Sequence, residues 1–152
     1  MQKEHLLPQL NHVGITVDSI EDTIDFYRRI TTVEVVAGPT RIAEEAVGDV
    51  IRVKRPNFRS CVVRIGTRGF ELVQHDTSKG DRIMGRHNNV GGVHLAFMVE
   101  NIESVMQSVK DLGITTTASE PYSSATLNGY KTFFFEDVNG YMVEIGQMPP
   151  SA

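Results

Sequence analysis

The chain has 152 residues and a mass of 16.9 kDa, close to the ~100–150 residues of an ordinary single domain. Hydrophobic residues make up 40% of it and charged residues 22%, a balance that excludes disordered, collagen-like and coiled-coil chains. The 15 Lys and Arg against 19 Asp and Glu give a formal net charge of −4. This acidic balance argues against a nucleic-acid partner.

The cysteine content and the hydropathy pattern favour an intracellular protein. The single cysteine, Cys61, has no second thiol for an intrachain disulfide or a cysteine-based zinc site. No window approaches the ~20 apolar residues that span a bilayer, and the N-terminal segment lacks the apolar region of a secretory signal. We therefore expect a cytoplasmic protein with no membrane partner.

Two ten-residue segments, 12–21 and 94–103, match each other without gaps. In both, an apolar run rich in β-forming residues is followed by a helix-capping residue, Ser19 in the first copy and Asn101 in the second. The matched residues are His12 with His94, Val17 with Val99, Asp18 with Glu100, and Ile20 with Ile102. The match predicts that one structural unit occurs twice.

The first half reads as a strand, a helix and then short strands. The helix carries apolar residues at helical spacing, namely Ile20, Thr23, Ile24, Tyr27 and Ile30. Strands are expected near 33–37, 49–54, 59–65 and 69–75. Gly66 and Gly69 are expected to flank a tight hairpin turn before the last strand.

The second half repeats this pattern after a crossover at residues 76–91. Its helix carries an equivalent stripe, formed by Ile102, Val105, Met106, Val109 and Leu112, and Gly113 is expected to end it. Strands are expected near 114–118, 120–123, 130–136 and 140–147, with the last turn at Asp137, Asn139 and Gly140.

We interpret each half as a βαβββ module, which makes the fold class α+β. Module 9–75 and module 92–147 are expected to pair into an eight-stranded, cup-shaped mixed sheet, so that residues 1–152 form a single domain. The interior of such a cup is a natural place for a small-molecule ligand.

Four polar residues occupy equivalent places in the two halves: His12, Glu71, His94 and Glu144. Strand alternation places each of them on the face opposite its aliphatic neighbours. A lone histidine or glutamate in a strand is more often exposed than functional, but a pseudo-twofold axis would bring all four to one point. Two imidazoles and two carboxylates suit one divalent ion such as Zn, Ni, Co, Mn or Fe.

The chain resembles the vicinal oxygen chelate superfamily, also called the glyoxalase/bleomycin resistance/dioxygenase superfamily. The segments that carry the resemblance are HVGITV with the later FYRR, GGVHLAFMVENIE, and a terminal D-x-N-G-x-x-x-E, and it covers about residues 9–147. In detail it looks closest to glyoxalase I and methylmalonyl-CoA epimerase. The resemblance implies a metal at the centre of the cup, held by His12, Glu71, His94 and Glu144.

A metal-dependent lyase or isomerase is the function that the resemblance implies. Such an enzyme acts on a small carbonyl or thioester substrate through a metal-stabilised enolate, with Glu144 or Glu71 as the base that takes the α-proton. Expected partners are a small-molecule substrate, such as a CoA or glutathione thioester or adduct, and a second copy of the chain in a homodimer. A segment with Lys54, Arg55 and Arg59 is the candidate for binding CoA phosphates.

Three other functions of the same superfamily remain open at this point. Thiol transfer to fosfomycin is one, and there the superfamily employs two histidines and one glutamate, so that the additional Glu71 counts against it. A non-haem iron dioxygenase uses two histidines and one glutamate, so Glu71 would occupy a coordination position that such an enzyme leaves free. A metal-free antibiotic-binding resistance protein depends on aromatic stacking, and this chain contains no tryptophan. No organic cofactor is expected in any of these cases.

Overall fold

The computed structural model describes residues 10–82 and 87–149. The chain divides into two compact units, Met1–Asp81 and Arg82–Ala152, and each contains its own four-stranded sheet. Residue 9 of the first expected module and residues 83–86 of the expected crossover lie outside the described residues. That the two modules form a single domain stays a prediction.

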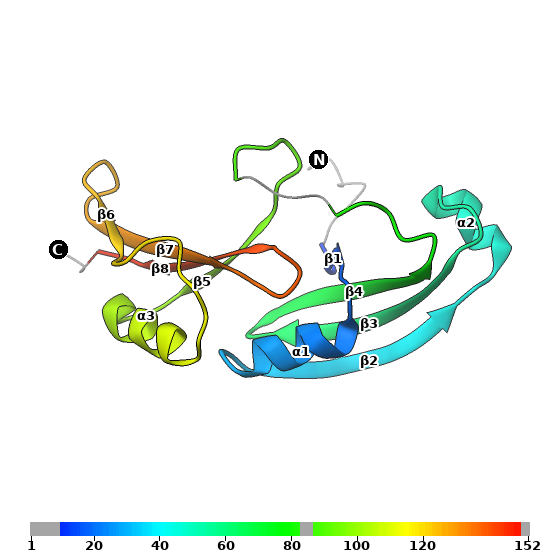
Figure 1. Ribbon diagram of the computed structural model, residues 1–152, viewed down its shortest axis with the longest axis horizontal. Helices are drawn as coiled ribbons and strands as arrows, with labels where there is room; N and C mark the ends of the chain where they lie inside the picture. Colours follow the sequence, from blue (N-terminus) through cyan, green and yellow to red (C-terminus); the bar gives the residue numbers. More distant parts are fainter. Residues whose placement is uncertain (1–9, 83–86, 150–152) are drawn as a thin grey trace, which may run out of the picture. The chain divides into compact units, whose positions relative to one another are not determined.

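The first unit is a mixed sheet with one helix packed on it. Its elements are β1 (Val13–Thr16), α1 (Ile20–Arg28), β2 (Val33–Ile42), α2 (Glu45–Ile51), β3 (Asn57–Ile65) and β4 (Arg68–Thr77). The strand order is β1-β4-β3-β2, with β1 parallel to β4 and the other pairs antiparallel. Helix α1 lies along one face of this sheet (Figure 1).

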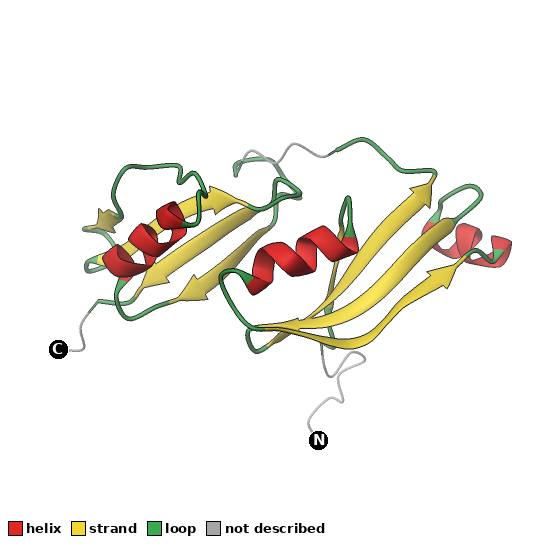
Figure 2. Ribbon diagram, turned by 60° about the horizontal axis from the view of Figure 1, so that its bottom comes forward, coloured by secondary structure: helices red, strands yellow, loops and turns green. Residues whose placement is uncertain are grey.

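The second unit has the same topology. Its elements are β5 (His94–Met98), α3 (Ile102–Asp111), β6 (Tyr122–Ser124), β7 (Tyr130–Glu136) and β8 (Met142–Gln147). The strand order β5-β8-β7-β6 repeats that of the first unit, again with one parallel pair, β5 with β8. Figure 2 shows α3 along one face of this sheet, as α1 lies on the other sheet. The predicted α+β fold with βαβββ modules is confirmed, whereas the joining of the two sheets into one cup stays a prediction.

The helix starts that the sequence predicts are confirmed at atomic detail. Ser19 accepts a hydrogen bond from the backbone N–H of Asp22, and Asn101 accepts one from the N–H of Ser104. The apolar stripes pack on the sheets, where the most deeply buried residues include Ile20 and Tyr27 in the first unit and Ile102, Phe133 and Val143 in the second. Each unit therefore has its own core between one helix and one face of its sheet.

Two of the expected strands are wrong. Residues 45–51 form α2, so the strand expected at 49–54 does not exist, and Arg52 ends that helix in the left-handed conformation with φ 58°. Residues 114–118 contribute one isolated bridge, Thr116 with Phe135, in place of a strand. The sequence predicted four strands after the helix in each half, one more than a βαβββ module contains. The strands predicted at 49–54 and 114–118 are the two extra ones.

No helix within residues 10–82 and 87–149 combines the length and the apolar character needed to cross a lipid bilayer.

Candidate functional site

The first unit holds a histidine–glutamate pair at the junction of β1 and β4. Gly14 lies opposite Glu71 in the parallel ladder, and His12 stands two residues before Gly14. The Nε2 atom of His12 is 3.3 Å from Oε2 of Glu71. The other carboxylate oxygen, Oε1, accepts a hydrogen bond of 2.5 Å from the hydroxyl of Ser60 on β3.

The orientation of His12 leaves its Nε2 atom facing the carboxylate. Its Nδ1 atom lies 2.8 Å from Oδ1 of Asn11, and an N–H donated there fixes the neutral ring in the tautomer that carries a lone pair at Nε2. A lone pair that faces an anionic oxygen at 3.3 Å is repulsive. In this tautomer, a metal cation between the two atoms would turn the contact into a favourable one.

The second unit holds the equivalent pair at the junction of β5 and β8. Ala96 lies opposite Glu144, and His94 stands two residues before Ala96, as His12 does before Gly14. The Nε2 atom of His94 is 3.2 Å from Oε2 of Glu144. Two hydroxyls donate to Oε1 of this carboxylate, Thr132 at 3.0 Å and Tyr130 at 2.9 Å.

Burial and the hydrogen bond to Glu144 both raise the pKa of the Tyr130 hydroxyl, burial being the larger cause. The hydroxyl therefore stays protonated at neutral pH and remains a donor to Glu144. The Glu144 side chain is 15% exposed, against 30% for Glu71. The second carboxylate is thus the more enclosed and the more firmly hydrogen-bonded of the two.

Aromatic rings flank the second pair. His87 lies with its ring centroid 5.2 Å from that of His94, and the ring of Phe134 is 5.7 Å from His87 and 6.3 Å from His94. Phe134 lies opposite Glu144 in the β7–β8 ladder. These contacts limit the orientations that the His94 ring can adopt.

Sequence reasoning missed the hydroxyl partners, although a signal for them exists. Ser60 and Thr132 stand at equivalent register positions, opposite Val73 and Gly146. The preceding residues are also equivalent, because Arg59 pairs with Glu21 on α1 and Lys131 pairs with Glu103 on α3. Extending the repeat from the helices to residues 59–60 and 131–132 would have identified both hydroxyls.

The structure brings the four candidate residues together as two pairs, one in each unit. Among the described residues no group of three or more His, Cys, Asp or Glu side chains is arranged to hold a metal ion. Two donors bound to one ion at the usual ~2.0–2.2 Å lie roughly 3.0–3.5 Å apart, and both pairs have this spacing. In each pair Oε1 is held by hydroxyls while Oε2 and Nε2 face each other, so the donor chemistry fits a divalent cation.

The basic segment does not form a continuous patch around the first pair. Arg59 forms an ion pair with Glu21 on α1 and also donates to Gln74. Ser60, the next residue along β3, faces Glu71, so the side chain of Arg59 leaves the opposite face of the sheet. Within the part of the chain that the structure describes, Lys54 and Arg55 have no ion-pair partner, so they are the cations of this segment left to meet an anionic ligand.

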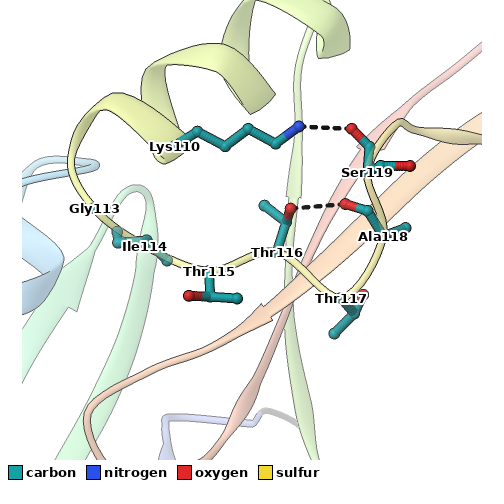
Figure 3. Close-up of a pocket in the computed structure, with 8 residues that line it drawn as sticks. All are labelled: Lys110, Gly113, Ile114, Thr115, Thr116, Thr117, Ala118 and Ser119. Atoms are coloured by element: carbon teal, nitrogen blue, oxygen red, sulfur yellow. Dashed lines mark hydrogen bonds between the residues drawn. The ribbon is translucent and has the colours of Figure 1, made fainter.

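A shallow hollow of about 500 Å³ lies where the chain leaves α3, lined by Lys110 and residues 113–119. Figure 3 shows that hydroxyl groups of threonines and Ser119 line it, and that Lys110 donates to the Ser119 carbonyl and Thr116 to the Ala118 carbonyl. None of the four candidate residues lines it. The Lys110 ammonium and the Thr116 hydroxyl close the loop on itself, and the lining residues include no histidine, cysteine or carboxylate.

Comparison with protein families and solved structures identifies the relatives of this fold. The model of the Glyoxalase/Bleomycin resistance protein/Dioxygenase superfamily matches residues 9–145. A glyoxalase family protein from Bacillus cereus has a TM-score of 0.74 at 20% identity, covering 97% of both chains. One from Enterococcus faecalis has a TM-score of 0.64 at 23% identity, covering 93% of this chain and 99% of its own.

A variant of the fosfomycin resistance protein FosX from Listeria monocytogenes, complexed with Mn(II) and a dihydroxypropylphosphonic acid, is also similar. Its TM-score is 0.59 at 14% identity, with 95% of this chain and 96% of that chain covered. A search of curated protein sequences gives no significant match. At these identities the solved structures establish the shared fold.

Proposed function

Because the chain belongs to the Glyoxalase/Bleomycin resistance protein/Dioxygenase superfamily, we propose that it is a divalent-metal-dependent lyase or isomerase. The observation that carries the proposal is the duplicated pair, His12 with Glu71 and His94 with Glu144, in which Nε2 and Oε2 face each other at 3.3 and 3.2 Å. Hydroxyls satisfy Oε1 in each pair, and a divalent cation between Nε2 and Oε2 would compensate the carboxylate charge there.

We propose that all four side chains hold one ion, which requires the two pairs to meet, with both pairs from one chain or each from a different chain. Two nitrogens and two carboxylate oxygens suit Zn, Ni, Co, Mn or Fe better than calcium or magnesium. The similar FosX variant is complexed with Mn(II), which supports a first-row metal. Such an ion polarises a substrate carbonyl and stabilises the negative charge that develops when a neighbouring proton leaves.

The residues of the chain would then move the proton. Glu144 is the first candidate for the base and Glu71 the second. In Glu144 the hydroxyls of Tyr130 and Thr132 occupy Oε1, so Oε2, once it is released from the ion, is the oxygen that accepts the α-proton and returns it to the same carbon in an epimerase or to the neighbouring carbon in an isomerase. The same holds for Glu71, in which Ser60 occupies Oε1. The proposed reaction therefore needs neither an oxidant nor an organic cofactor.

We propose a small carbonyl or thioester as the substrate class. A substrate oxygen bound next to the base is what proton transfer at the α-carbon requires. Lys54 and Arg55 are the candidates for binding the phosphates of a CoA ester. Because Arg59 is paired with Glu21, the segment offers two cations to such a ligand instead of the three that the sequence predicted. A glutathione adduct, which carries carboxylates but no phosphates, is therefore an equal candidate.

Exchange of the substrate α-proton with solvent deuterium tests the reaction class. The metal-loaded protein is incubated in D₂O with methylmalonyl-CoA, with the hemithioacetal of methylglyoxal and glutathione, and with catechol, each with and without oxygen. We expect NMR to show exchange in one of the first two substrates and no requirement for oxygen. Glu144→Gln should slow the exchange by ~10²–10⁴-fold, the usual cost of losing a general base.

The matched control is Glu120→Gln, which makes the same chemical change at an exposed position and should leave exchange unchanged. Metal content is measured in each variant, so that a lost base is distinguished from a lost ion. Oxygen-dependent turnover of catechol alone would overturn the proposal in favour of a dioxygenase. Binding of an antibiotic without metal, together with no exchange in any substrate, would favour a resistance protein.

A further inference from the structure

The two histidine–glutamate pairs differ in one partner. Equivalent hydroxyls, Ser60 and Thr132, donate to the two carboxylates. Two residues before them stand Phe58 in the first unit and Tyr130 in the second. Phe58 is 6% exposed and its ring lies against His75, whereas the hydroxyl of Tyr130 reaches Glu144 at 2.9 Å.

A second difference between the units, a glycine on the neighbouring strand of the second unit, provides the space that Tyr130 occupies. Opposite Ser60 on β4 stands Val73, and opposite Thr132 on β8 stands Gly146. A Cβ atom at position 146 would lie 2.1 Å from the hydroxyl oxygen of Tyr130 and 2.8 Å from its Cζ atom. No side chain fits at that distance, so Gly146 provides the space in which the Tyr130 ring lies. The Phe58 and Val73 combination has been replaced in the second unit by a tyrosine and a glycine that fit each other.

We propose that Tyr130, in the space left by Gly146, is a positioning residue that fixes Glu144 with Oε2 directed to His94 and so raises the affinity of the second pair for a divalent ion. The inference rests on the proposed metal site. A carboxylate held by one hydroxyl can turn about its Cγ–Cδ bond and exchange its two oxygens. Two donors converging on Oε1 oppose that rotation, which leaves Oε2 as the ligand.

This arrangement makes the two carboxylates unequal ligands. Glu144 is 15% exposed and held by two hydroxyls, whereas Glu71 is 30% exposed and held by one. Outer partners that orient metal ligands typically contribute ~10–100-fold to metal affinity. The second pair therefore contributes more of the affinity for the ion, and Tyr130 accounts for a measurable part of that contribution.

Titration of the metal-free protein with Co(II), followed by its absorption spectrum, tests the inference. We expect Tyr130→Phe to weaken binding by roughly 10–100-fold and to alter the spectrum of the bound ion, because Glu144 then adopts more than one orientation. Tyr122→Phe is the matched control, since it removes a phenolic hydroxyl from an exposed tyrosine of the same unit and should change neither.

Substitutions at the glycine test the steric part. Gly146→Val should weaken Co(II) binding at least as much as Tyr130→Phe, because the new side chain displaces the tyrosine. The double variant with Tyr130→Phe and Gly146→Val carries the residues of the first unit, and because the hydroxyl is then absent it should bind no more tightly than Tyr130→Phe alone. Circular dichroism and thermal unfolding show whether each variant is folded, and Tyr130→Phe keeps the test decisive if Gly146→Val is not.

His94→Ala separates failure of this inference from failure of the metal site. If His94→Ala abolishes Co(II) binding while Tyr130→Phe binds within two-fold of wild type with an unchanged spectrum, the positioning role is refuted and the metal site stands. If His94→Ala binds Co(II) like the wild type, the metal site itself is refuted, and the role of Tyr130 with it.

Discussion

In each unit a glutamine lies three residues after the candidate glutamate. Its side chain accepts a hydrogen bond from the first residue of the helix and so connects the helix to the strand that carries the glutamate. The backbone N–H of Ile102, the first residue of α3, donates to Oε1 of Gln147 on β8 at 2.7 Å, and the N–H of Ile20 donates to Gln74 at 2.9 Å. The first N–H groups of a helix have no partner within the helix. Because Asn101 caps Ser104, Gln147 is the partner of Ile102.

Replacement of Gln147 by alanine should lower the stability of the second unit. Ile102 is fully buried, so its N–H would lose the glutamine and gain no water in exchange, which costs about 2 kcal/mol. For a protein of this size that corresponds to a fall of roughly 4–8 °C in melting temperature. Differential scanning calorimetry of the metal-free protein measures the change directly.

Two further variants determine whether the hydrogen bond is the cause. Gln147→Glu keeps an acceptor oxygen and places a negative charge at a helix N-terminus, where it is favourable, so it should melt near the wild type. Gln107→Ala removes an exposed glutamine from the same helix and should change the stability by no more than ~0.5 kcal/mol. If Gln147→Ala melts within 1 °C of Gln107→Ala, the argument from the buried N–H is wrong.

Three other predictions concern pH, thiol reactivity and assembly. The hydrogen bond from Arg59 lowers the pKa of Glu21 below its ordinary value of 4.5. The wild type should therefore be more stable than Arg59→Gln above about pH 4.5, and this difference should disappear as the pH falls through the lowered pKa. A difference in stability that stays constant with pH in acid-unfolding curves would contradict this. Cys61 is fully buried and burial raises the pKa of its thiol, so a disulfide reagent should react with it only on unfolding, and rapid reaction of the native protein would refute the burial argument. Light scattering should give about twice the 16.9 kDa chain mass, and a monomer across micromolar concentrations would rule out the expected homodimer.

The sequence predicted α1 and α3 because the signals that start and end them are local, whereas it did not predict α2, which has no side-chain cap. A capping side chain three residues before its backbone partner identifies Ser19 and Asn101, and both hydrogen bonds exist. Gly113 follows α3 with φ +75°, as expected of a glycine that ends a helix. The turn at Asp137 is also confirmed, since its carboxylate accepts from the N–H groups of Asn139 and Tyr141.

The strands predicted at 49–54 and 114–118 do not form, because strand formation depends on pairing partners that the local sequence does not specify. The segment at 49–54 is rich in β-branched residues, but β2 and β3 pair with each other, and this segment is only the connection between them. Val50 is 81% exposed there, so its β-branched side chain packs against no sheet. Residues 114–118 connect α3 to β6, and the edge of β7 beyond one bridge is taken by β6.

The two histidine–glutamate pairs were predictable as far as the internal repeat reaches, whereas the meeting of all four residues at one point stays a prediction. The matching of His12 with His94 and of Glu71 with Glu144 led to two pairs with almost equal geometry. Tyr130 could not be found in this way, because a repeat reveals what two copies share, and the tyrosine and Gly146 are where the copies differ. Differences of this kind require the register of the strands, which the structure supplies.

The metal content of the purified protein tests the central claim most directly. Elemental analysis is made on the wild type and on His12→Ala and His94→Ala, one variant for each pair, after loading with a divalent metal and removal of the excess. We predict about one ion per chain in the wild type and loss of the ion in both variants, because each pair supplies half of the ligands. Equal metal content in all three proteins would contradict the account.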